Sequence, residues 1–221
     1  MATSRVVQAM DAVRRVGFLP ADERRHADLD VPLAIGWGQT NSQPTTVRQM
    51  LELLDVRPGD RVLDVGAGSG WTTALLARLT GAAGKVVAVE RVPGLVAAGA
   101  ANLERAGMPW ASLRQATPGV FGEPSQGPYD RILVSAQARE LPDELVDQLA
   151  PGGVLVVPVN GRMLRAVRHA AGGPPEVEEH GWYRFVPLVR DAPEATPFPD
   201  APGPTTPPPD GSGRGVEERS G

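Results

Sequence analysis

The chain has 221 residues, of which 41% are hydrophobic, so it can form one globular domain with a substantial core. Its formal net charge of −4 and its pI near 5.4 argue against a broad basic surface of the kind that binds nucleic acid or an anionic membrane. The absence of cysteine excludes disulfides and thiolate metal sites, and the three scattered histidines argue against a histidine-rich metal site, so we expect no bound metal.

The N-terminal segment predicts a helix and no targeting signal. Residues 1–20 lack the uninterrupted apolar core of a secretory signal, and no run of about 18 apolar residues occurs anywhere in the chain. We therefore expect a soluble, cytoplasmic protein. We also expect a monomer that binds neither nucleic acid nor membrane. Apolar residues at positions 6, 7, 10, 13 and 16 recur at helical spacing, which predicts a helix over Val6–Val16.

A polar segment, IGWGQTNSQP (Ile35–Pro44), precedes the first convincing strand. Its glycines, amides and hydroxyls are typical of a surface loop. Its position before the predicted sheet leads to the hypothesis that it covers a site built by later residues. A helix is expected next, over about Thr45–Leu54, ended by Pro58-Gly59.

Strands and helices then alternate between about residues 60 and 160. This alternation predicts an α/β fold with a doubly wound, mostly parallel sheet between helix layers, which is a three-layer, Rossmann-like αβα arrangement. The expected strands are 61–65, 85–90, 112–115, 129–135 and 154–159, the expected helices are 71–80, 95–105 and 141–149, and a turn is expected at 151–153. Three late strands of hairpin character are expected at 164–169, 175–179 and 181–189.

The C-terminal segment has a different composition. Residues 191–221 contain eight prolines and five glycines and a single aromatic residue, Phe198. Such a segment buries too little apolar surface to offset the entropy lost on ordering, so a disordered tail is expected after a domain of residues 1–190. A proline-rich ligand for a partner protein is the alternative interpretation.

The glycine-rich turn Gly66-Ala67-Gly68-Ser69-Gly70 follows a predicted strand and opens a predicted helix. Helix amides at such a turn favour an anionic group. A dinucleotide-binding turn has a third glycine at the place that Trp71 occupies, so the pattern favours a nucleoside that carries an amino acid over one that carries a pyrophosphate. A purely structural turn remains the alternative.

Glu90 ends the next predicted strand, about twenty residues after the turn. A carboxylate at that place can accept hydrogen bonds from both hydroxyls of a ribose. A solvated strand end is the alternative interpretation of Glu90. Turn and acid together favour an adenosine-containing ligand, bound at the carboxyl ends of the strands.

Five blocks of sequence, spread over about Val6–Val189, bear on the family. They are GQTNSQP, VLDVGAGSGWTTALLARL, VVAVERVPGL, PYDRILVSAQARELPDELVDQLAPGGVLVVPV and RFVPLV. Together they resemble the protein-L-isoaspartate O-methyltransferase family. The resemblance implies an enzyme that uses S-adenosylmethionine to methylate the free carboxylate of isoaspartyl residues in damaged proteins or peptides. The methyl ester then cyclises to a succinimide, and hydrolysis of the succinimide restores part of the material to aspartate.

The resemblance also implies roles for individual residues. Ser42 corresponds to the serine that the family associates with activity, although a turn serine that bonds its own backbone is the alternative. The residues expected to bind the cofactor are Thr40, Asn41, Ser42, Gly66, Ala67, Gly68, Ser69, Glu90, Arg91, Ala116 and Thr117. Those expected to form the peptide groove, by pairing with the substrate as an added strand, are Arg184, Phe185, Val186, Pro187 and Leu188.

The sequence departs from the family pattern at several places, two of which fall on residues expected at the site. The usual Gly-Asp-Gly near the adenine is replaced within Gln115–Gly119, which removes an acid and predicts weaker cofactor binding. The usual Thr-Ile-Ser is Thr40-Asn41-Ser42. The main alternative is therefore a peptide-tailoring enzyme that esterifies an aspartate of a ribosomally made peptide to form an aspartimide. A non-catalytic sensor of S-adenosylmethionine is a third hypothesis, and Trp71 argues against an NAD-dependent oxidoreductase.

Overall fold

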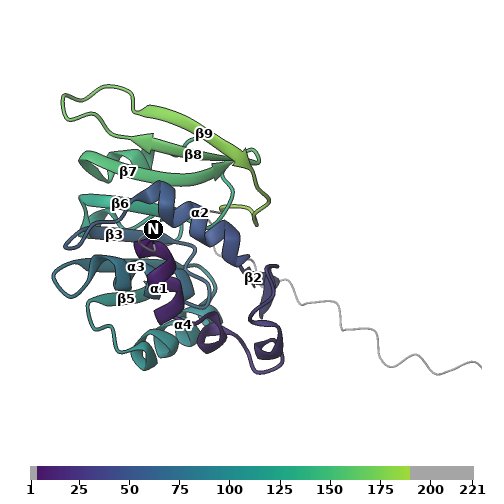
Figure 1. Ribbon diagram of the computed structural model, residues 1–221. Helices are drawn as coiled ribbons and strands as arrows, with labels where there is room; N and C mark the ends of the chain where they lie inside the picture. The colour runs from purple at the N-terminus through teal and green to yellow at the C-terminus, as the bar shows by residue number, and fades with distance from the viewer. Residues whose placement is uncertain (1–3, 190–221) are drawn as a thin grey trace, which may run out of the picture.

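The structure is a computed structural model that describes residues 4–189 (Figure 1). The predicted tail, 191–221, and the predicted domain boundary at residue 190 lie outside the described residues. Within residues 4–189, none of the helices has the length and apolar character that crossing a membrane requires.

A seven-stranded sheet forms the centre of the protein, in the order β5-β4-β3-β6-β7-β8-β9. The strands β3 to β7 run parallel to one another, whereas β8 is antiparallel to both of its neighbours. The strands are β3 (Arg61–Val65), β4 (Lys85–Glu90), β5 (Ala111–Gln115), β6 (Tyr129–Val134), β7 (Leu149–Val159), β8 (Arg162–Val167) and β9 (Glu176–Trp182). This arrangement confirms the predicted doubly wound, mostly parallel sheet.

Helices cover the sheet unequally. The helices are α1 (Arg5–Ala12), α2 (Pro44–Leu54), α3 (Trp71–Thr80), α4 (Pro93–Ala106) and α5 (Asp143–Asp147), with 3₁₀ turns η1 (Arg15–Phe18), η2 (Arg24–His26) and η3 (Pro124–Gln126). Because successive strand residues point to opposite faces, Val62 packs with residues of α1, α2 and α3, while Leu63 packs with Leu145 of α5. Figure 1 shows α1, α2 and α3 on the same side of the sheet.

The polar segment before the sheet is a β-hairpin rather than a loop. Its strands are β1 (Leu33–Gly36) and β2 (Gln39–Asn41), which pair with each other and with no strand of the large sheet. The two residues at the tip, Trp37 and Gly38, both have positive φ, of 50° and 67°. Positive φ at both central residues is the geometry that joins two twisted antiparallel strands by a tight turn.

Two predicted helices are shorter than expected. The first ends at Ala12, and the chain then forms the 3₁₀ turn η1, which buries Arg15. The helix predicted for 141–149 covers only Asp143–Asp147, because β7 already begins at Leu149.

The turn predicted at 151–153 lies inside β7, as an irregularity in its pairing with β6. Gly152 has a φ of +77°, and a Cβ on Gly153 would lie 2.8 Å from the carbonyl oxygen of Ala150. Arg168 bonds to this glycine pair, since its carbonyl accepts from Gly152 N and its amide donates to the carbonyl of Gly153. These bonds extend the pairing of β7 with β8 back to residues 152–153, ahead of the strand start predicted at residue 154.

The last predicted strand, 181–189, is wrong beyond Trp182. Residues 183–189 form an extended segment with one isolated bridge, between Pro187 and Gln137. Gln137 N donates to the carbonyl of Val186 at 2.7 Å, and Leu188 N donates to the carbonyl of Gln137 at 2.7 Å. The backbone of Pro187 itself faces away from Gln137, and because Pro187 has no N–H, the edge on that side lacks a donor at this position.

Candidate functional site

The candidate site lies at the carboxyl ends of β3, β4 and β6. The strand order reverses between β3 and β6, which is where open α/β sheets bind ligands. The glycine turn connects β3 to α3, and Gly66, Gly68 and Gly70 have φ values of +82°, +53° and +85°. A Cβ on Gly70 would lie 3.1 Å from the carbonyl oxygen of Gly99 in α4, so the turn is also packed closely against a neighbouring helix.

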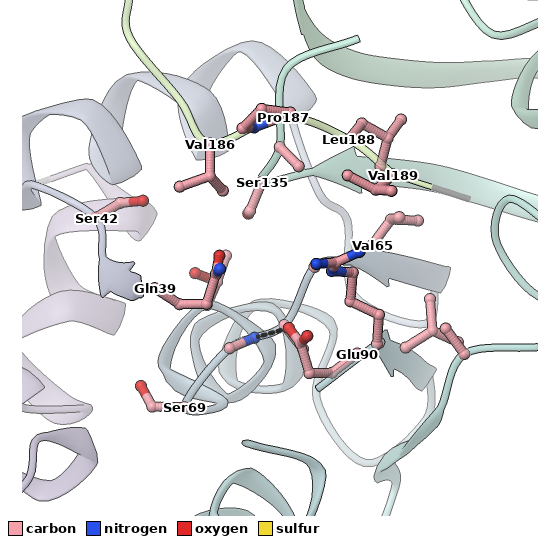
Figure 2. A pocket seen from close by; sticks show the side chains of 18 of the residues that line it. Gln39, Ser42, Val65, Ser69, Glu90, Ser135, Val186, Pro187, Leu188 and Val189 are labelled. Carbon is pink, nitrogen blue, oxygen red and sulfur yellow. Dashed lines mark hydrogen bonds between the residues drawn. The ribbon is translucent and has the colours of Figure 1, made fainter. Parts of the chain in front are cut away.

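Glu90 is fixed beneath the glycine turn. Its Oε2 accepts a hydrogen bond from Gly68 N and its Oε1 accepts one from Val92 N, both at 2.9 Å, and the residue is only 6% exposed (Figure 2). Glu90 is therefore not a solvated strand end. Each carboxylate oxygen retains a lone pair, so Glu90 can still accept from two hydroxyls of a ligand.

Six segments of the chain enclose one cavity. In Figure 2, Gln39 and Ser42 of the hairpin region lie on one side, Glu90 and Ser69 lie below, and Val186–Val189 lie above. The lining comprises Ile35, Gln39, Thr40, Asn41, Ser42, Val65, Gly66, Ala67, Gly68, Ser69, Trp71, Thr72, Val89, Glu90, Arg91, Gln115, Ala116, Pro118, Val120, Phe121, Gly122, Ser135, Ala136, Val186, Pro187, Leu188 and Val189.

The predicted site residues gather at this cavity with three exceptions. All of those expected at the cofactor line it except Thr117, which is exposed. Among those expected in the peptide groove, Val186, Pro187 and Leu188 line it, while Arg184 is exposed and Phe185 packs against the core.

Sequence reasoning missed several lining residues. Ser135 and Ala136 follow β6 directly, so their place at the carboxyl edge of the sheet was available from the strand prediction. Gln39 lies within the polar segment Ile35–Pro44. Val189 is the last residue of the RFVPLV block, which was expected to form part of the peptide groove, and it does line the cavity. Phe121 carries no local signal, because only the folded chain brings it to the cavity.

The segment expected near the adenine, Gln115–Gly119, contributes no acid to the cavity. Gln115 Nε2 donates to the carbonyl of Arg91 at 2.7 Å, and Ala116 N donates to the carbonyl of Glu90 at 2.9 Å. Pro118 is the next residue of this segment that lines the cavity. Among the described residues that line it, Glu90 is the only one with a carboxylate.

A second buried carboxylate, Asp64, lies next to the site without lining it. Its Oδ2 accepts a hydrogen bond from Thr73 Oγ1 at 2.7 Å, while Oδ1 has no hydrogen-bond partner in the structure. Burial raises the pKa of Asp64 to about 7, and the nearby charge of Glu90 acts in the same direction. The bond from Thr73 opposes this shift, because it favours the ionised form.

Comparisons with known proteins agree with one another. A family model described as Protein-L-isoaspartate(D-aspartate) O-methyltransferase matches residues 1–192. The protein-L-isoaspartate O-methyltransferase of Methanopyrus kandleri is 43% identical over 190 residues, which cover 85% of this chain and 84% of that protein. The enzyme of the same name from Anaeromyxobacter dehalogenans strain 2CP-1 is 47% identical over 190 residues, which cover 84% of this chain and 89% of that protein.

A solved structure is also similar. It is the crystal structure of a Plasmodium falciparum protein described as a protein-L-isoaspartate O-methyltransferase, in complex with S-adenosyl-L-homocysteine. It matches with a TM-score of 0.72 and 27% identity, over 86% of this chain and 93% of that chain.

Proposed function

Because the chain belongs to the protein-L-isoaspartate O-methyltransferase family, we infer that it transfers the methyl group of S-adenosylmethionine to the free carboxylate of L-isoaspartyl residues in damaged proteins and peptides. The next backbone amide attacks the resulting ester and expels methanol, which leaves a succinimide. Hydrolysis of the succinimide then gives aspartyl and isoaspartyl linkages, so repeated cycles repair the chain. One observation of the structure carries this function: the glycine turn, Glu90 and Ser42 face a single cavity.

The cavity fits S-adenosylmethionine, which is the cofactor. Gly66 and Gly68 leave the floor free of side chains, and a Cβ on Gly68 would lie 3.1 Å from Ile35 Cδ1, which shows how little room there is at that point. We propose that Glu90 accepts hydrogen bonds from the ribose hydroxyls, while Ser69 and Asn41 contact the methionine part. When bound, the cofactor supplies an electrophilic methyl group on a sulfonium.

The residues of the chain then have to orient the substrate rather than activate it. An isoaspartyl carboxylate is already ionised at neutral pH, so no general base is required. We propose that the hydroxyl of Ser42 donates to one carboxylate oxygen and aims the other along the line of transfer, as positioning catalysis requires. The hairpin that carries Gln39 and Thr40 excludes water from the reacting atoms.

The segment 186–189 forms the proposed substrate wall. The carbonyl of Val186 and the amide of Leu188 are already bonded to Gln137, so the backbone edge that faces away from Gln137 belongs to Pro187. That edge offers a carbonyl and no N–H. We therefore propose that a substrate donates one backbone hydrogen bond here and otherwise contacts the apolar side chains. Because these contacts do not depend on particular substrate side chains, the wall tolerates many substrate sequences.

A labelling experiment tests this function. The purified full chain is incubated with methyl-labelled S-adenosylmethionine and either of two peptides that differ only in an aspartyl or an isoaspartyl linkage. We expect label in the isoaspartyl peptide, and its release as methanol as the ester cyclises. Equal labelling of both peptides, or labelling of the aspartyl peptide alone, contradicts the proposed substrate. Labelling of neither, while S-adenosylhomocysteine still binds, contradicts the repair activity.

A further inference from the structure

Arg15 is a buried charge beside the candidate site. It is 5% exposed, whereas its neighbour Arg14 forms an exposed ion pair with Asp28. Removing a guanidinium from water is costly unless its donors are satisfied. Burial lowers the pKa of Arg15 from its usual value, yet a guanidinium stays charged at neutral pH. A charge held in this way needs a specific explanation.

Arg15 donates most of its hydrogen bonds to the end of the hairpin, at Asn41 and Ser42. Nε donates to Asn41 Oδ1 at 2.7 Å, and one terminal nitrogen lies 2.9 Å from the carbonyl oxygen of Asn41 and 3.0 Å from that of Ser42. The remaining contacts are with the carbonyls of Leu29 and Val31, at 3.1 and 2.9 Å. One side chain therefore holds both Asn41 and Ser42.

The side chain of Asn41 extends this link to the glycine turn. It is buried, and its Nδ2 donates to Ser69 Oγ at 3.0 Å while its Oδ1 accepts from Arg15. Arg15 itself does not line the cavity, whereas Asn41, Ser42 and Ser69 do. Three segments that are distant in sequence are thereby connected through polar contacts.

We propose that Arg15 is a positioning residue for methyl transfer, which fixes the backbone of Ser42 directly and the hydroxyl of Ser69 through the amide of Asn41. The inference rests on the proposed function, because it assumes that Ser42 and Ser69 contact the reacting groups. A purely structural role is the competing explanation, since Arg15 also lies over the ring of Trp71, 5.6 Å from its centroid.

The first test compares Arg15→Lys with Arg14→Lys. Lysine keeps the charge, but its single nitrogen cannot reach both the Asn41 side chain and the Ser42 carbonyl in the geometry of the guanidinium fork. Because a misplacement of about 1 Å can cost roughly 100-fold in rate, we expect the kcat of Arg15→Lys to fall by about 10- to 100-fold. The KM for the isoaspartyl peptide should change little, and Arg14→Lys should retain the wild-type kcat.

Rates are expressed per active site, counted by calorimetric titration with S-adenosylhomocysteine, so that a loss of folded protein is not mistaken for a loss of rate. A kcat for Arg15→Lys within twofold of wild type overturns the proposal. A fall that disappears when rates are expressed per active site also overturns it.

The second test is chemical rescue of Arg15→Ala. A cleft of about 190 Å³ lined by Arg14, Arg15 and Trp71 gives a small cation access to the vacated space. We expect guanidinium at non-denaturing concentrations to raise the kcat of Arg15→Ala at least fivefold. The same addition should leave the kcat of Arg14→Ala unchanged. Rescue that is equal in both variants, or absent from both, overturns the proposal.

Amide hydrogen exchange separates failure of this inference from failure of the proposed function. Exchange at residues 39–43 should be at least tenfold faster in Arg15→Ala than in wild type or Arg14→Ala, and guanidinium should slow it again. This measurement needs no methyl acceptor, so it stands even if the wild type fails to label an isoaspartyl peptide. Unchanged exchange would show that Arg15 does not hold the hairpin end, whatever the substrate is.

Discussion

The buried carboxyl of Asp64 should make the stability of the protein fall as the pH rises. Its pKa is about 7 in the folded protein, against an ordinary value of 3.8 for an aspartate side chain. Between these two values the folded state binds more protons than the unfolded state, so the free energy of unfolding decreases as pH increases through this window. When this slope is integrated from about pH 5 to about pH 8, Asp64 lowers the free energy of unfolding by about 2–3 kcal/mol.

Asp64→Asn isolates that contribution, because the amide has nearly the same shape, cannot titrate, and keeps an oxygen that can accept from Thr73. Urea denaturation, followed by tryptophan fluorescence, measures the free energy of unfolding at each pH. We expect the variant to gain about 2–3 kcal/mol relative to wild type between about pH 5 and about pH 8. Glu104→Gln, on the exposed face of α4, is the control and should follow wild type. If Asp64→Asn and wild type give parallel pH profiles, the carboxyl is already ionised throughout this range and the reasoning is wrong.

Three further predictions concern the ligand. Ser42→Ala should lose turnover while its calorimetric affinity for S-adenosylhomocysteine stays near that of wild type; unaltered turnover would remove this hydroxyl from the mechanism. Pro118→Asp places a carboxylate at the cavity wall and should tighten S-adenosylhomocysteine binding by about tenfold or more, the value of a charge-assisted hydrogen bond, whereas Thr117→Asp, outside the wall, should not. Gly94→Ala should release the hairpin tip and speed the dissociation of S-adenosylhomocysteine in stopped-flow measurements, because its Cβ would lie 2.1 Å from Trp37 Cζ2; an unchanged dissociation rate would show that this contact does not retain the ligand.

The central sheet and the glycine turn were predictable because their signals are local. The strands β3 and β4 are buried on both faces, so each is a short apolar run bounded by turn residues. Their parallel register pairs Val65 with Val89, and this places Glu90 beside the turn that follows β3. The spacing of the two motifs along the sequence therefore translates directly into proximity in space.

The parts that could not be predicted depend on contacts between distant residues. The segment 184–189 has the composition of a strand, but it becomes a cavity wall because Gln137 bonds to it on both sides of Pro187. Arg15 lies inside the helix predicted for Val6–Val16, at a polar position of the apolar pattern, so the pattern gives no sign of its burial. Its acceptors are mostly backbone carbonyls, which no sequence pattern identifies.

The two departures from the family pattern that fall on the expected site have different physical consequences. An amide at position 41 would be costly if buried without partners, yet its oxygen accepts from Arg15 and its nitrogen donates to Ser69, so the substitution is accommodated inside the protein. At the adenine side, the described lining provides no second carboxylate to replace the missing acid. The first departure therefore gives no reason to assign a different substrate. The second should appear in cofactor affinity, which means that a high concentration of S-adenosylmethionine should compensate for it.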